Sequence, residues 1–131
     1  MTKKELSKYY YLSVEINELE AQIKELMDSL VGSPNLTGMP HGSGVGNPVE
    51  QKAILMVNLK NKLEKRRAKA LKQLTKIELY IANIEKAEVR LIFTKRYIQF
   101  KRWEDIAREM CMSESSMFRR HKEQLKNEQH R

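Results

Sequence analysis

Outside one short segment, this sequence of 131 residues contains neither glycine nor proline. All five glycines and all three prolines lie within residues 32–48. Sheets built from strands and tight turns need such residues at many positions along the chain. The distribution therefore argues against β architectures and predicts an all-α protein with one major interruption.

Cysteine, long apolar runs and catalytic motifs are also scarce. The single cysteine, Cys111, excludes an intramolecular disulfide and a zinc site with several cysteines, and we expect it to be a small buried residue. The longest apolar run, Ala53 to Val57, is far shorter than the ~20 residues that span a bilayer, and no export signal follows Lys3 and Lys4. We therefore expect a cytoplasmic protein with no membrane partner. No phosphate loop, nucleophile–base pair or metal cluster stands out, so we expect no enzyme, cofactor or metal.

Two long helices are predicted before residue 87. In residues 2–31 and 48–84, apolar residues recur every three or four positions, which is typical of a narrow helical stripe. Thr2 and Glu5 fit a capping box, and Pro48 suits a first helical turn. We expect residues 1–87 to form a long antiparallel helical hairpin that packs like a coiled coil. The same stripe could instead pair two chains, and a homodimer is expected.

The segment 32–48 is long for a connection between helices. Such segments are usually functional or flexible, so it is either a tether or an ordered loop that contacts a partner. His41 has no neighbours at ligand spacing and suggests no metal site.

The chain carries a net charge of +8, which favours a polyanionic partner. Residues 60–76 contain eight basic residues and one acidic residue. Within this stretch, lysines recur at helical spacing and are possible contacts to a phosphate backbone: Lys62, Lys65, Lys69, Lys72 and Lys76. The alternative is a solvated face that complements the acidic first helix.

From residue 88 the apolar pattern changes to that of short helices, and we expect a second domain at 88–131. Ile106 and Met110 fit the core face of one short helix, and Ala107 is small where a second helix crosses. Ser113 suits the cap of that second helix, and Met117 its inward face. This pattern predicts a helix-turn-helix whose second helix, 113–126, enters the major groove of double-stranded DNA.

Several polar and aromatic residues of this region are candidate DNA contacts. Arg119 suits a guanine edge, Phe118 a thymine methyl group, and Glu114 either cytosine or the positive end of the helix. Arg120 occupies a position that is usually apolar, and we expect it to extend to phosphate. We also expect His121 to be at the surface or facing phosphate. The complete candidate set is Lys101, Arg102, Ser113, Glu114, Ser115, Ser116, Phe118, Arg119, Arg120 and Lys122.

Residues 88–125 resemble region 4 of the sigma-70 family, which reads the promoter −35 element. The resemblance rests on Glu88 to Ile98, Trp103 to Ala107, Met112-Ser113, Met117 to His121 and Leu125. The whole chain is similar to the ArpU-like late-gene activators of phages of Gram-positive hosts, and residues 37–44 resemble a loop that recurs in small proteins of such phages. Cys111 departs from the glycine common in this turn, and no counterpart of the DNA-melting sigma region 2 is present.

The resemblance implies a phage transcriptional regulator that acts in the bacterial host cell, as a late-gene activator or sigma-like factor with host RNA polymerase as a possible partner. Two alternatives stay open. The hairpin could be a protein-interaction module that binds RNA polymerase or a phage assembly protein. The chain could also be the DNA-recognition subunit of a phage packaging machine.

Overall fold

A computed structural model describes residues 1–31 and 48–129, and every regular element in this part of the chain is helical. The elements are α1 (Lys3–Val31), α2 (Pro48–Ala82), α3 (Ala87–Phe93), a π-helix (Thr94–Ile98), α4 (Trp103–Glu109) and α5 (Glu114–Gln129). The prediction of an all-α fold is confirmed. Apart from Pro48, the predicted interruption at 32–48 lies outside the described residues. None of the described helices combines the length and the hydrophobicity that crossing a membrane requires.

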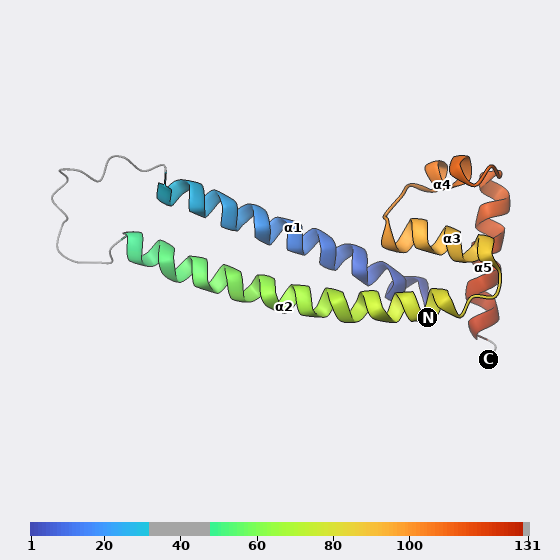
Figure 1. Cartoon of the computed structure of the whole chain (residues 1–131), viewed down its shortest axis with the longest axis horizontal. Helices are drawn as coiled ribbons and strands as arrows, with labels where there is room; N and C mark the ends of the chain where they lie inside the picture. The colour runs from blue at the N-terminus through green and yellow to red at the C-terminus, as the bar shows by residue number, and fades with distance from the viewer. Residues whose placement is uncertain (32–47, 130–131) are drawn as a thin grey trace. The chain divides into compact units, whose positions relative to one another are not determined.

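Helices α1 and α2 run in opposite directions beside each other, as Figure 1 shows. The Thr2 hydroxyl accepts a hydrogen bond of 3.2 Å from the amide of Glu5, which caps the start of α1 as its sequence predicted. Pro48 is the first residue of α2, where its missing amide proton costs no helical hydrogen bond. The long hairpin expected from the two apolar stripes is therefore present.

The contacts group the chain into two compact units. Residues 14–68 form one, which we call the hairpin unit, and residues 1–13 with 69–131 form the other, which we call the composite unit. Both long helices contribute to both units. The predicted division into residues 1–87 and 88–131 stays a prediction.

The hairpin unit is held together by the predicted stripe. Ile23 of α1 and Leu59 and Leu63 of α2 are buried, with four partly buried residues around them: Ile16, Leu19, Leu26 and Met56. Ion pairs flank this core, and their nitrogen–oxygen distances are 2.6 Å for Arg66–Glu15 and 2.9 Å for Arg67–Glu20. The acidic first helix thus neutralises part of the basic second helix. Because these pairs are exposed, apolar burial supplies most of the stability here.

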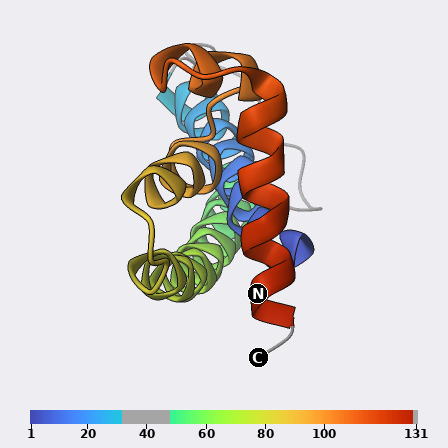
Figure 2. The same ribbon diagram turned by 90° about the vertical axis from the view of Figure 1, so that its right-hand side faces the viewer.

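The composite unit has a larger core, which combines the first residues of the chain with residues after 69. Its main cluster consists of Leu6, Ile77, Ile81, Ile84, Val89, Phe93 and Tyr97. These residues come from α1, the end of α2 and its following turn, α3 and the π-helix. In Figure 2, α3, α4 and the long α5 are seen together at the end of the chain.

Side chains, in place of glycine and proline, shape the connections after α2. The Arg90 guanidinium donates hydrogen bonds to the carbonyl oxygens of Ile84 (2.7 Å) and Glu85 (3.0 Å), which fixes the turn before α3. After α3, the Gln99 amide bonds to the Thr94 carbonyl, and Phe100 takes a left-handed backbone with φ of 58°. Such a conformation is uncommon for a large side chain and is maintained by its surroundings.

His121 lies inside the composite unit with 7% of its surface exposed, so the expectation of a surface or phosphate-facing residue is wrong. Its Nε2 is 2.5 Å from the Tyr97 hydroxyl, and its ring stacks on Phe93 at a centroid distance of 5.0 Å. Burial, with smaller contributions from Lys3 and Arg96, lowers the pKa of His121 to about 4. Burial likewise raises the pKa of Tyr97 to about 12, so both partners are neutral at pH 7.

The free energy of unfolding is expected to fall as the pH is lowered from about 6.5, the pKa of an unfolded histidine, to about 4. In this window His121 takes up a proton in the unfolded chain but stays neutral in the folded chain, so protonation favours unfolding. Urea unfolding at several pH values measures the effect. His121→Phe keeps an aromatic ring at this place but cannot take up the proton, so its stability should depend less on pH in this window. Parallel curves for both proteins would contradict the assignment.

Candidate nucleic-acid interface

Helices α4 and α5 form the predicted helix-turn-helix. Its core contains Ile106 and Ala107 of α4 and Met117 of α5, all buried against Ile92 of α3. Ala107 retains only 5% of its surface exposed, consistent with the close approach of a neighbouring helix at a small residue. Trp103, Met110 and Met112 pack around this cluster.

The turn between the helices depends on one left-handed residue and one cap. Cys111 has φ of 53° and is exposed, so the expectation that it is buried is wrong. The left-handed backbone closes the turn where glycine is common, and Met112 is the turn residue that packs against the core. The Ser113 hydroxyl accepts a hydrogen bond of 3.2 Å from the Ser116 amide, which caps α5 as predicted.

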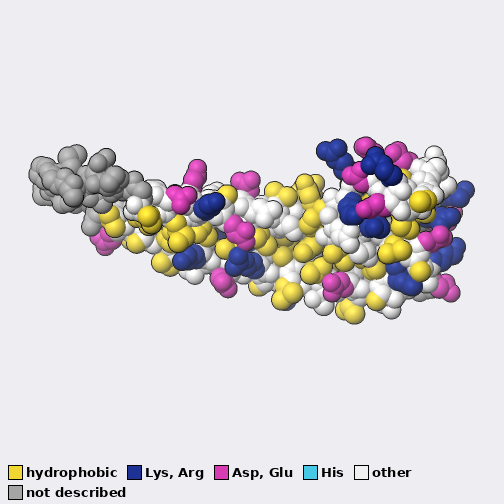
Figure 3. Space-filling model, turned by 45° about the horizontal axis from the view of Figure 1, so that its top comes forward, with side chains coloured by type: hydrophobic (Ala, Val, Ile, Leu, Met, Phe, Trp, Pro, Cys, Tyr) yellow, Lys and Arg dark blue, Asp and Glu magenta, His cyan; other side chains and the backbone are white. Residues whose placement is uncertain are grey.

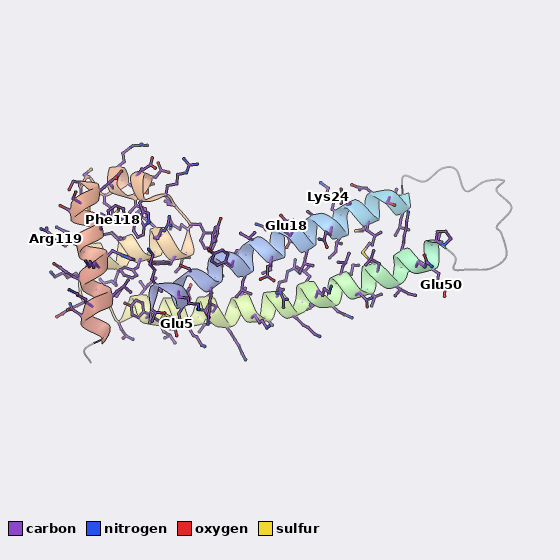
Figure 4. All side chains as sticks on the ribbon, turned by 180° about the vertical axis from the view of Figure 1, so that it is seen from behind. Glu5, Glu18, Lys24, Glu50, Phe118 and Arg119 are labelled. Carbon is purple, nitrogen blue, oxygen red and sulfur yellow. The ribbon has the colours of Figure 1, made fainter. Side chains whose placement is uncertain are left out.

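The first two turns of α5 carry most of the predicted base contacts on their exposed face. Glu114, Ser115, Arg119 and Lys122 are exposed, and Phe118 has 42% of its surface exposed. Figure 4 shows Phe118 and Arg119 on α5. Ser113 is also exposed, and Ser116 is half-buried. The structure therefore places two cations, a carboxylate, hydroxyl groups and an aromatic ring at the start of one helix.

The two basic residues that precede α4 differ in their surroundings. The Lys101 ammonium group lies 2.5 Å from a carboxylate oxygen of Glu109, and Lys95 lies 3.3 Å from the other oxygen. The hydrogen bond from Lys101 is the main reason that the pKa of Glu109 lies below its usual value. Arg102 is exposed and pairs with no carboxylate of the described residues. Arg102 is thus free to bind an external anion, whereas Lys101 would first have to leave Glu109.

Arg120 forms an ion pair with Glu88 of α3. Its guanidinium is half-buried, and the pair links α5 to α3 inside the composite unit. The expected extension of this side chain to phosphate competes with that pair. Sequence reasoning missed Glu88 as a partner because 32 positions separate the two residues.

The five lysines proposed as backbone contacts on α2 are all exposed. Lys62 and Lys65 belong to the hairpin unit, and Lys69, Lys72 and Lys76 to the composite unit. None of the five forms an ion pair with a described carboxylate, so their charges are available to solvent or to a partner.

Replacing Cys111 by glycine is expected to stabilise the protein. A left-handed backbone costs a residue with a Cβ atom ~1–2 kcal/mol, and glycine avoids this cost while losing ~0.5–1 kcal/mol through the entropy of the unfolded chain. We expect a net gain of about 0.5–1 kcal/mol in urea unfolding. Cys111→Ala retains the Cβ atom and is the control that should not gain. Equal stabilities of the glycine and alanine variants would contradict the conformational cost.

Comparison with known proteins identifies one family. A family model described as "Protein of unknown function (DUF1492)" matches residues 30–128, a span that includes α2, α3, α4 and all but the last residue of α5. No curated protein and no solved structure matched the chain. Since the matched residues make up more than half of the sequence, the chain belongs to the DUF1492 family.

Proposed function

We propose that this protein is a sequence-specific DNA-binding regulator that reads the major groove with the first turns of α5. The observation that carries the proposal is the exposed face of α5, where Ser115, Phe118, Arg119 and Lys122 lie on a helix positioned by α4. A major groove accepts one α-helix, and this face offers groups that recognise base edges and phosphates.

The roles divide by chemistry. Arg119 is exposed without a carboxylate partner among the described residues, and its planar fork suits a guanine edge. Phe118 offers an apolar edge for a thymine methyl group. Ser113, Ser115 and Lys122 suit phosphate oxygens, as does Arg102 before α4.

The net charge of +8 supports the same partner, since phosphate neutralisation supplies much of the affinity for DNA. A role in phage transcription, with host RNA polymerase as a partner, is the part of the proposal that rests on the resemblance of residues 88–125 to sigma-70 region 4. A packaging role would use the same DNA-binding face but requires a ring of many chains, which a mass measurement would reveal.

Arg119→Ala is expected to weaken binding to the preferred site by about 1–3 kcal/mol and to relax specificity at one base pair. The preferred site comes from selection among random duplexes, and the affinities come from fluorescence anisotropy at two salt concentrations. Lys122→Ala should weaken binding to all duplexes alike and reduce the salt dependence.

Arg108→Ala is the matched control, because Arg108 is a similarly exposed arginine that lies on α4, where its guanidinium pairs with Asp105 of the same helix. It should bind the preferred site nearly as wild type does. If Arg119→Ala also binds like wild type, α5 is not the recognition helix. If wild type prefers no duplex over random DNA, the proposal of sequence-specific binding fails.

The hairpin unit favours a second candidate function, association with another protein chain. Within the apolar run Ala53 to Val57, only Met56 packs on the core, whereas Ile54, Leu55 and Val57 are each about half exposed. Hydrophobic side chains are visible on the surface of this hairpin in Figure 3. Contiguous exposed apolar residues are typical of protein interfaces, and we propose that they pair two copies of this chain.

Replacing both Ile54 and Val57 by lysine is expected to convert a dimer into a monomer, because two charges would be buried in the apolar contact. Sedimentation equilibrium measures the mass of each protein. The control is Asn17→Lys together with Ala21→Lys, which adds the same charge at exposed positions of α1 on the side away from its apolar stripe. A wild-type chain that stays monomeric, or a control that dissociates equally, would argue against pairing through Ile54 and Val57.

A further inference from the structure

A pocket of about 400 Å³ lies in the composite unit between the first turns of α1 and the segment that follows α3. Its lining residues are Leu6, Ser7, Tyr10, Tyr11, Arg96, Tyr97, Phe100 and Arg102. Leu6 and Tyr97 are buried and belong to the main core, whereas Tyr10, Tyr11 and Arg102 are exposed. The volume falls within the range of small-molecule sites, ~300–1,000 Å³.

One part of the lining is aromatic. The Tyr10 ring meets the Phe100 ring edge to face at a centroid distance of 5.3 Å. It also meets the Tyr11 ring edge to face, at 5.4 Å. Tyr10 and Tyr11 retain 46% and 64% of their surface exposed. These rings offer apolar area that a planar ligand would cover, and their hydroxyl groups can form hydrogen bonds.

The other part of the lining is cationic. Arg96 donates a hydrogen bond of 3.0 Å to the Lys101 carbonyl, and its guanidinium lies 4.6 Å from the centre of the Trp103 ring. No carboxylate in residues 1–31 and 48–127 pairs with Arg96 or Arg102. Two guanidinium groups at one pocket, both without an acidic partner, suit a phosphate group.

The backbone beside the pocket departs from regular helix. The π-helix Thr94–Ile98 carries Arg96 and Tyr97, and the left-handed Phe100 follows it. Phe100 also meets Tyr9 at 5.4 Å, so this conformation brings its ring to the aromatic residues of α1. Irregular turns of this kind are frequent at ligand sites, where they place side chains that a regular helix would point elsewhere.

We propose that this pocket binds a nucleoside monophosphate. Arg96 and Arg102 would bind its phosphate, and Tyr10, Tyr11 and Phe100 would contact its base. Ser7 and the tyrosine hydroxyl groups add hydrogen-bonding capacity on the α1 side. This proposal does not depend on DNA binding.

Trp103 provides a built-in reporter of the site, because it is the only tryptophan of the chain. Its ring contacts Arg96 on one side and Phe118, the exposed aromatic residue of α5, at a centroid distance of 5.2 Å. A phosphate that binds Arg96 changes the charge next to the indole ring. Ligand binding is therefore expected to alter Trp103 fluorescence.

The experiment titrates the full chain, without DNA, with AMP, with adenosine and with inorganic phosphate. Trp103 fluorescence and isothermal calorimetry report binding. AMP should give a saturable change, and adenosine and phosphate should each bind about tenfold more weakly or worse, because each lacks one half of the ligand. Failure of AMP to bind, or equal binding of either half, would overturn the proposal.

Arg102→Ala and Tyr11→Ala test the lining, because both side chains are exposed and their loss leaves the core intact. Each should weaken AMP binding about tenfold while the thermal unfolding midpoint stays close to that of wild type. Arg108→Ala removes an exposed arginine that does not line the pocket and should bind AMP as wild type does. Wild-type affinity in Arg102→Ala, or an equal loss in Arg108→Ala, would show that the pocket is not the site.

Discussion

The packing around Phe93 is the contact on which the composite unit depends. This fully buried ring lies within 6 Å, centroid to centroid, of Tyr80 on α2, of Tyr97 on the π-helix and of His121 on α5. One side chain thereby joins the end of α2, the π-helix and α5. Helix α5 is positioned by this stack and by Met117, so its exposed face depends on apolar burial more than on ion pairs.

Much of the fold could be predicted because the chain concentrates its helix breakers in one place. With all glycine and proline inside 32–48, the stripes around Leu59 and Ile77 had to lie on uninterrupted helices. The helix-turn-helix was equally accessible, because Ala107, Ser113 and Met117 have roles that follow from size, capping and spacing. In both regions, the helices begin and end within a few residues of the predicted positions.

The errors arose where tertiary contacts or backbone conformation decide the outcome. His121 looked like a surface residue because the burial of a histidine depends on a partner such as Tyr97, which is 24 positions away. Cys111 looked buried because its hydrophobicity favours the core, but the turn requires a left-handed residue whose side chain points to solvent. The pocket lined by Tyr10 and Arg96 combines residues 6–11 with residues 96–102, two segments that no local sequence pattern connects.

The composite unit is discontinuous in sequence, since residues 1–13 pack with residues 69–131 while residues 14–68 form a unit of their own. During synthesis, Leu6 leaves the ribosome long before Ile77 and Phe93, the residues that bury it. The hairpin unit, whose contacts are closer in sequence, can close first and then brings residue 13 near residue 69. Closure of the hairpin would thus shorten the search for the contacts that bury Leu6, and insertions in the hairpin would slow completion of this core without touching it.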